Sequence, residues 1–286
     1  MAKVNFSNSR YAFQIWTTMS GQSWGGCLEA RPGGLEELDT APSAGTPNTR
    51  WVPFFQPDEP DSTQFSGYSY SYLSDGGPGN ATADARLQRY QKYAGSSSSS
   101  PNAGCGLLAI QPLTNNATTL KNTLNSMIAT GNTHVSLGVG WGWRTLSPTA
   151  PYTEGAPYGD PYWNKAMVVL TDGTNTMPMA NTFHQSNYTA FNYLVRNNLL
   201  TAAQAHTLAA AEAELDNRTA TVCANAKAAG IRIYSILLMD NSTRAVNLMR
   251  NCATSPDLYF NSPGAAQLQG VFDAIATDLS NLRVSK

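Results

Sequence analysis

The acidic side chain of Asp172 stands where sheet proteins often carry chemistry. Residues 166–170 form an unbroken apolar run, which predicts a strand buried on both faces of a parallel sheet. Thr171, Asp172 and Gly173 end this run, because Asp and Gly favour a sharp turn. Open α/β sheets hold their sites at the carboxyl ends of strands. The sequence therefore predicts Asp172 at such an edge, either in a site or in a turn without a binding role.

A serine in a G-x-S-x-G pattern offers a second kind of chemistry. Residues 21–25 place Ser23 in this pattern, which would make it the nucleophile of a secreted serine hydrolase. Such a nucleophile needs a strand before it and a helix after it, and the Pro and Gly residues of 31–34 oppose that helix. The hydrolase is therefore the alternative function.

A D-x-S pattern and three histidines complete the set of candidate groups. Asp240 and Ser242 follow an apolar run and resemble part of a metal-binding loop. The alternative is a strand end followed by a helix cap, in which Asn241 or Ser242 bonds a free backbone N–H. The histidines are scattered without an acidic partner and are expected to be surface or packing residues: His134, His184 and His206.

Composition argues against several classes of function. Charged residues make up 13% of the 286 residues, and the formal net charge is −1 without a basic block. The sequence therefore shows no electrostatic footprint for nucleic acid or for an anionic membrane surface. No apolar run reaches the roughly 18 residues that a membrane span requires.

Four cysteines bear on the cellular compartment. None forms a C-x-x-C pair or lies close to a histidine, which argues against zinc. Cys223 lies near the end of one predicted helix and Cys252 follows the next, so helices packed side by side would bring the two within bridging distance. Cys27 and Cys105 would then tie together the ends of an irregular region. Four free thiols are the alternative, and disulfides would indicate an oxidising compartment.

The elements that must position these groups fall into two unlike parts. Residues 7–104 have little periodicity and form an irregular insertion, with one short helix expected at 84–93 and tyrosines alternating over 68–72 as on a strand. Residues 105–286 alternate helical and apolar segments, which predicts an α/β core with a doubly wound, mainly parallel sheet. The expected strands are 107–113, 166–170, 231–239 and 258–260, and the expected helices are 118–128, 134–146, 201–229, 243–250 and 265–282, with a short helical piece near 191–195.

Two helix ends are predicted from residue type. Thr118 or Thr119 is expected to cap the helix that begins there. Gly230 is expected to follow the end of the long helix, because glycine is the common residue just past a helix terminus.

Five stretches carry a family resemblance: Trp24–Pro32, Val139–Pro148, Cys223–Ile236, Leu248–Pro256 and Tyr259–Lys286. They resemble the von Willebrand factor type A domain of TadG-like proteins, which belong to the tight-adherence (Flp) pilus system. An apolar strand that ends in T-D-G after a G-x-T loop and a helix is similar to type A domains in general. Because the similarity covers nearly the whole chain, it implies that residues 1–286 form one partial type A domain.

In that family, three segments at the top of the sheet hold one divalent cation. The resemblance implies that Thr133, in the sequence GNT, and Asp172, in TDG, are ligands of Mg²⁺, which prefers hard oxygen ligands and leaves a position for a partner's acidic group. It also implies a non-enzymatic, extracytoplasmic module for pilus assembly and adhesion. Such a module would be anchored to the membrane in the full-length protein, in the periplasm or at the cell surface. Its partners would be proteins of the pilus machinery.

The chain departs from the family pattern at its beginning. No D-x-S-x-S precedes Thr133, and Met1 stands almost where the family's second strand would finish. The resemblance therefore implies an N-terminally truncated domain whose first strands, principal metal ligands and membrane anchor lie upstream. We expect upstream residues to complete the Mg²⁺ site. A sheet without its first strand is expected to expose apolar surface.

Overall fold

The computed structural model describes the chain except for residues 1–14, 58–89, 95–99, 263 and 285–286. Its sheet has three parallel strands in the order β1 (Ala166–Thr171), β2 (Arg232–Leu238) and β3 (Tyr259–Ser262). Short apolar runs separated by helices produce this arrangement, because parallel neighbours need a crossover between them. The α/β class and the parallel pairing expected from the sequence are confirmed.

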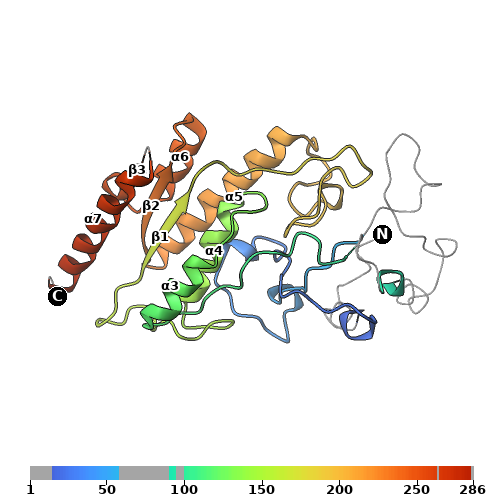
Figure 1. The fold of residues 1–286 in the computed structure, drawn as a ribbon, viewed down its shortest axis with the longest axis horizontal. Helices are drawn as coiled ribbons and strands as arrows, with labels where there is room; N and C mark the ends of the chain where they lie inside the picture. The colour runs from blue at the N-terminus through green and yellow to red at the C-terminus, as the bar shows by residue number, and fades with distance from the viewer. Residues whose placement is uncertain (1–14, 58–89, 95–99, 263, 285–286) are drawn as a thin grey trace.

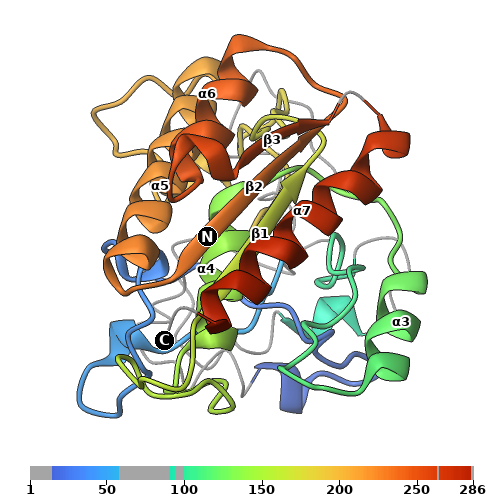
Figure 2. The ribbon, with the colours of Figure 1, turned by 90° about the vertical axis from the view of Figure 1, so that its left-hand side faces the viewer.

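Helices cover both faces of the sheet (Figures 1 and 2). One face carries α4 (Val135–Leu146), α5 (Leu208–Ala228) and α6 (Thr243–Cys252), and the other carries α7 (Ala265–Val284). Side chains from α4, α5 and α6 share one buried cluster with the sheet, and Ile275 of α7 belongs to another. The strands are therefore wound with helices on both sides.

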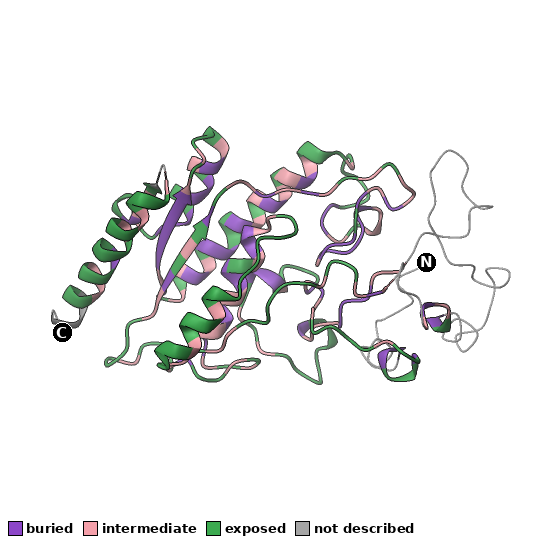
Figure 3. Ribbon diagram, in the orientation of Figure 1, coloured by how far each residue is buried: buried purple, intermediate pink, exposed green. Residues whose placement is uncertain are grey.

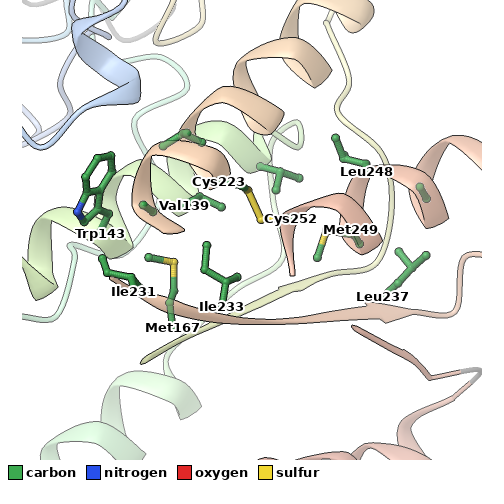
Figure 4. Close-up of a cluster of buried hydrophobic side chains, with 14 residues drawn as sticks. Val139, Trp143, Met167, Cys223, Ile231, Ile233, Leu237, Leu248, Met249 and Cys252 are labelled. Carbon is green, nitrogen blue, oxygen red and sulfur yellow. A yellow bond between two sulfur atoms is a disulfide. The ribbon is translucent and has the colours of Figure 1, made fainter. Parts of the chain in front are cut away.

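The alternation of side chains along β2 builds a core on each face. Ile233 and Leu237 pack beneath α4, α5 and α6 (Figure 4), while Tyr234 and Ile236 pack on the side of α7. All four are fully buried. Burial on both faces is typical of a strand inside a parallel sheet.

β1 departs from the prediction because only one of its faces is covered. Met167 points into the core on the α4 side. Val168 and Leu170 are 40% and 45% exposed on the other face. The expectation of a strand buried on both faces is wrong, because β1 is the last strand at its edge of the described sheet and only Ala166 packs against the cluster that α7 forms with β2 and β3.

The apolar segment 107–113 forms no strand, which corrects the prediction. Leu107 and Leu108 are 64% and 48% exposed, so no partner strand or core covers them within the described part of the chain. α3 (Ala117–Asn125) follows and also carries no buried residue, as Figure 3 shows. The apolar residues are spaced as in a strand and a helix, but those of segment 107–113 and of α3 are not buried.

Two helices begin elsewhere than predicted because of their caps. The side chain of Asn116 accepts hydrogen bonds from the amides of Thr118 and Thr119, so Asn116 is the cap of α3 and neither threonine is. α5 was expected to begin at residue 201. It begins after Thr207, whose hydroxyl caps its first turn.

The end of α5 follows the prediction for Gly230. This glycine has a φ of 84°, in the left-handed region that favours glycine. Its amide donates to Lys227 O (2.9 Å), and the next amide, of Ile231, donates to Ala226 O (3.1 Å). This pair of bonds is a Schellman motif, which satisfies the last carbonyls of the helix.

The described part of the irregular region contains short helical pieces and an aromatic cluster. A helical turn covers 15–18, and 3₁₀ turns cover η1 (Leu35–Glu37), η2 (Pro47–Thr49) and η4 (Tyr90–Tyr93). The tyrosines of 68–72 and most of the helix expected at 84–93 lie outside the described residues. The short helical piece expected near 191–195 is η5 (Leu194–Arg196). Six side chains form the cluster: Ile15, Trp16, Met19, Phe55, Tyr90 and Tyr93.

Both disulfides have the pairing expected from the topology. Cys223 and Cys252 join α5 to the end of α6 inside the main core (Figure 4). Cys27 and Cys105 join the irregular region to the segment that follows it. The alternative of four free thiols is wrong, because the structure has no free cysteine.

Two buried arginines organise the irregular region, and one of them attaches it to the α/β core. Arg31 donates to the carbonyls of Thr40, Thr49, Leu35 and Leu38, so one guanidinium closes the loop around η1 and η2. Arg144 of α4 forms an ion pair with Glu36 (2.8 Å) across 108 residues of sequence. Burial lowers the pKa of Arg31 to about 10, which leaves it charged at neutral pH.

Candidate functional site

The segments that carry Thr133 and Asp172 meet at the carboxyl end of β1. The Thr133 amide donates to Thr176 Oγ1 (3.1 Å), and the Thr176 amide donates to Thr133 O (3.0 Å). Asp172 directly follows β1, in a turn where the Thr171 hydroxyl donates to Gly173 O (3.0 Å). The structure thus joins the two loops that the family resemblance assigned to one site.

A buried amide, Asn175, holds these loops to the helices. Its side chain is fully buried, and its Oδ1 accepts from the amide of Val135, the first residue of α4 (2.7 Å). Its Nδ2 donates to Asp216 (2.8 Å) and Thr219 (3.1 Å) of α5. The N-cap residue of α4, His134, provides no side-chain cap. Asn175 therefore satisfies a helix N-terminus that would otherwise lack a partner.

Arg244, at the start of α6, braces the same loop from the other side. It forms ion pairs with Asp216 and Glu212 of α5, each at 2.7 Å. It also donates to the carbonyl of Asn175 (3.1 Å). The hydrogen bond to Asp216 raises the pKa of Arg244. Three helices thus fix the backbone that follows Asp172.

The two candidate ligands have oxygen atoms that are free to bind. The Asp172 carboxylate is exposed, and it makes no hydrogen bond or ion pair with the described part of the chain. The Thr133 hydroxyl is also without a partner there. A carboxylate and a hydroxyl fit the hard oxygen ligands of Mg²⁺, but two of them leave most of its coordination sphere to water or to other groups. Among the described residues, no cluster of three His, Cys, Asp or Glu side chains could hold a metal.

The D-x-S pattern at the end of β2 is a helix cap. The Ser242 hydroxyl accepts from the amide of Ala245, in the first turn of α6 (3.3 Å). Asp240 Oδ1 accepts from the amide of Ser242 (2.7 Å). The expected alternative, with Ser242 as the cap, is confirmed.

Ser23 does not lie in a nucleophile elbow. The described residues on either side of it form neither a strand nor a helix. Its carbonyl accepts from the Asn102 side chain (2.7 Å). This local structure gives the G-x-S-x-G pattern no catalytic geometry.

The histidines lie against other side chains. His184 is buried and stacks on Tyr193, with ring centroids 3.7 Å apart. His206 shares a hydrogen bond with Gln185 (2.7 Å). His134 is partly exposed, but its Nε2 is shielded from solvent, and desolvation lowers its pKa to about 4. His134 is therefore neutral at physiological pH.

Sequence reasoning missed the residues that position the site. Asn175 lies two residues after the TDG turn, and Arg244 lies two residues after the D-x-S pattern, but neither is assigned a role from the sequence. Asp216 gave no signal on an Ala-rich helix. An amide soon after a strand-ending turn is the one local sign that was present, because Asn side chains often bond nearby backbone.

Comparisons with known proteins give no family. No family model matches the chain, and no curated protein matches it. Among solved structures, the pilus adhesin SpaC from Lactobacillus rhamnosus GG aligns with a TM-score of 0.37 and 17% identity, over 57% of this chain. The alignment covers 21% of the adhesin chain. A likeness of this size does not establish a common fold.

Two further observations concern the compartment. Both cysteine pairs are oxidised, which fits an extracellular or surface protein. The helices in the described part of the chain are too short or too polar to cross a membrane.

Proposed function

We propose that this chain is a non-enzymatic interaction domain of the von Willebrand factor A kind, which acts outside the cytoplasm in a Flp pilus assembly or adhesion system. The observation that carries the proposal is the joining of the Thr133 and Asp172 loops at the carboxyl end of β1. The resemblance to TadG-like proteins supplies the pilus system, and the two disulfides support an oxidising compartment.

In this proposal, Thr133 and Asp172 contribute two oxygen ligands to a Mg²⁺ ion. Residues upstream of the chain, in a membrane-anchored protein, supply the rest. Bound Mg²⁺ would supply positive charge and an open position for an acidic group of the partner. The chain's own contribution is rigidity, because Asn175 and Arg244 fix the loop before any ligand arrives.

The metal role is tested by Asp172→Ala, with Asp240→Ala as the matched control. Asp172 is exposed and Asp240 is partly exposed, and both follow neighbouring parallel strands, but only Asp172 is assigned as a ligand. Mn²⁺ serves as the probe, because its broadening of backbone NMR signals reports proximity. We expect broadening near 133 and 172 that Asp172→Ala removes and Asp240→Ala retains. Equal broadening in both variants would contradict the metal role.

The partner role is tested in the full-length protein that contains this chain. We expect binding to pilus proteins to require Mg²⁺ and to be lost in Asp172→Ala. Unchanged binding in the presence of a chelator would remove the metal from the proposal. Normal pilus assembly in the Asp172→Ala variant would contradict a role for this site in assembly.

A further inference from the structure

The loop between α4 and β1 presents two consecutive aromatic side chains to solvent. Tyr162 is 90% exposed and Trp163 is 66% exposed. Within the described part of the chain, neither ring packs on another ring, and neither the Tyr162 hydroxyl nor the Trp163 indole N–H makes a hydrogen bond. Single exposed apolar residues are ordinary on a protein surface. An adjacent pair that makes no contact needed by the fold indicates a binding surface instead.

Two backbone turns hold this aromatic pair in a fixed place. The Oδ1 atom of Asp160 accepts from the Tyr162 amide (2.9 Å), and the Asp160 carbonyl accepts from the Trp163 amide (3.3 Å). Gly159 comes directly before them with a φ of 75°, in the left-handed region that favours glycine. Because the backbone is already ordered, a ligand has to immobilise only the side chains.

The base of the loop is anchored to the rest of the molecule. The Tyr158 hydroxyl donates to Asp39 of the irregular region. The Nζ atom of Lys165 donates to the carbonyls of Leu146 and Ala156. Figures 1 and 2 show the loop below the sheet, at the end of β1 opposite to the candidate metal site. The aromatic pair is therefore a separate surface from that site.

The polar groups near the pair are neutral or acidic. Glu154 and Asn164 are exposed, and their side chains make no hydrogen bond with the described part of the chain. The Oδ2 atom of Asp160 accepts none there either. Lys165 is the one cationic residue of 147–165, and backbone carbonyls already surround its ammonium. The loop thus offers free acceptors and a free amide without an available positive charge.

The size of the exposed pair argues for a small ligand. Two aromatic side chains exposed to this degree offer on the order of 300 Å² in all. A specific protein complex buries about 800 Å² on each partner. A short glycan needs less surface, and it presents both C–H faces for stacking on aromatic rings and hydroxyls for polar side chains. The loop has groups that match each of these.

We propose that the loop of residues 147–165 binds a neutral glycan. The rings of Tyr162 and Trp163 stack on the C–H faces of the sugar units. The Asp160 carboxylate and the Asn164 amide hydrogen-bond the sugar hydroxyls. The two carboxylates of the loop repel sialylated or sulfated glycans. Binding needs no metal ion, so it is independent of the Mg²⁺ proposal.

A lipid surface and a basic or proline-rich peptide fit this loop less well. Aromatic anchors at a membrane surface are accompanied by Lys or Arg, and the ammonium of Lys165 is already occupied. Proline-rich peptides dock into grooves lined by aromatic residues, whereas Tyr162 is almost fully exposed. Both ligands are included in the test as competitors.

The probes are soluble oligosaccharides added to the full chain in the presence of a chelator. Chitotetraose, cellotetraose, mannotetraose and lacto-N-tetraose are neutral, and sialyllactose is the anionic comparison. Each is used up to about 10 mM, which detects dissociation constants in the millimolar range. The first readout is the NMR signal of the Trp163 indole N–H, which is identified by its loss in Trp163→Phe. The second is saturation transfer from the protein to the oligosaccharide.

We expect at least one neutral oligosaccharide to shift the Trp163 signal saturably, and sialyllactose not to shift it. The double variant Tyr162→Ala, Trp163→Ala should weaken binding at least about tenfold by saturation transfer, because both stacking surfaces are lost. The matched control is Phe272→Ala, which removes a 42% exposed aromatic side chain from α7 and should leave binding unchanged. Thermal unfolding of each variant confirms that it is folded.

Three results would overturn the proposal. One is the absence of any response of the folded chain to every neutral oligosaccharide. Another is equal saturation transfer in the unmodified chain and in the double alanine variant. The third is a Trp163 shift that only phosphatidylcholine vesicles or a Lys- and Pro-rich peptide produce, which would make a lipid surface or a peptide the ligand of this loop.

Discussion

Asn175 shows how one side chain can decide the shape of a site that it does not enter. Its amide accepts from α4 and donates to two residues of α5, and its carbonyl accepts from Arg244 of α6. The position of Asp172 was predictable because it follows a strand that ends in a turn, whereas Thr133 was expected only from the family resemblance. Asn175 and Arg244 act through partners about 30 to 70 residues away, and no local pattern encodes such contacts.

Replacing Asn175 tests this role. We expect Asn175→Ala to lower the free energy of unfolding by about 2–3 kcal/mol, because it leaves the buried amide of Val135 without a partner and removes one hydrogen bond each from Asp216 and Thr219. The matched control is Asn217→Ala, which removes an exposed side-chain amide from α5, the helix that Asn175 contacts. It should change the free energy of unfolding by less than about 0.5 kcal/mol. Urea unfolding followed by circular dichroism measures both. Equal effects would show that the clamp is not needed.

His134 makes stability depend on pH. Its pKa is lowered to about 4 in the folded chain by desolvation, against an ordinary value of 6.5. Between these values the unfolded chain binds more protons than the folded chain, so stability falls as the pH drops from about 6.5 to about 4. The loss is on the order of 2–3 kcal/mol. The urea midpoint should depend less steeply on pH across this range in His134→Gln than in the unmodified chain. The same pH dependence in both would contradict the role of His134.

At the scale of elements, periodicity predicted most of the fold after residue 130. The helices and strands from α4 to α7 follow it closely, and Gly230 ends α5 as expected. Two predictions failed for different reasons. Segment 107–113 is apolar enough for a strand but has no strand beside it among the described residues, and the helix expected from residue 201 begins only after the Thr207 cap. Local propensity cannot supply a missing partner.

Two glycines, one just past the end of a helix and one inside a helix, test the role of backbone conformation. Gly230→Ala should lower the free energy of unfolding by about 1 kcal/mol, because an alanine at a φ of 84° is strained although space is free around it. Gly138→Ala, inside α4 and also in open space, should instead be neutral or stabilise by up to about 1 kcal/mol. Thermal unfolding of both variants gives the comparison. Effects of the same sign would contradict it.

At the scale of the whole molecule, an irregular region is attached to a layered core. The aromatic cluster around Phe55 and Tyr93 is separate from the clusters beneath the sheet. The buried pair of Glu36 and Arg144 and the disulfide of Cys27 and Cys105 connect the two. Composition predicted this division. It did not predict the arginines, because buried charges are rare and carry no sequence periodicity.

The two disulfides should therefore affect different regions. The double variant Cys27→Ser, Cys105→Ser opens a loop of 78 residues, worth up to about 4.5 kcal/mol by chain entropy. We expect hydrogen exchange to speed up around the aromatic cluster while the amides of β2 stay protected. Cys223→Ala, Cys252→Ala should show the reverse, because that pair lies in the main core. Loss of β2 protection in the first variant would show that the regions unfold together.

The order of the cysteines bears on how the two disulfides form. Cys27 pairs with Cys105 and Cys223 with Cys252, so each bond joins cysteines that are consecutive along the chain. A polypeptide that emerges N-terminus first presents the first pair to an oxidase before the third cysteine arrives. An enzyme that joins cysteines in their order of appearance then gives the native connectivity directly. Residues 1–286, expressed in an oxidising compartment, should acquire both disulfides in a cell that lacks a disulfide isomerase.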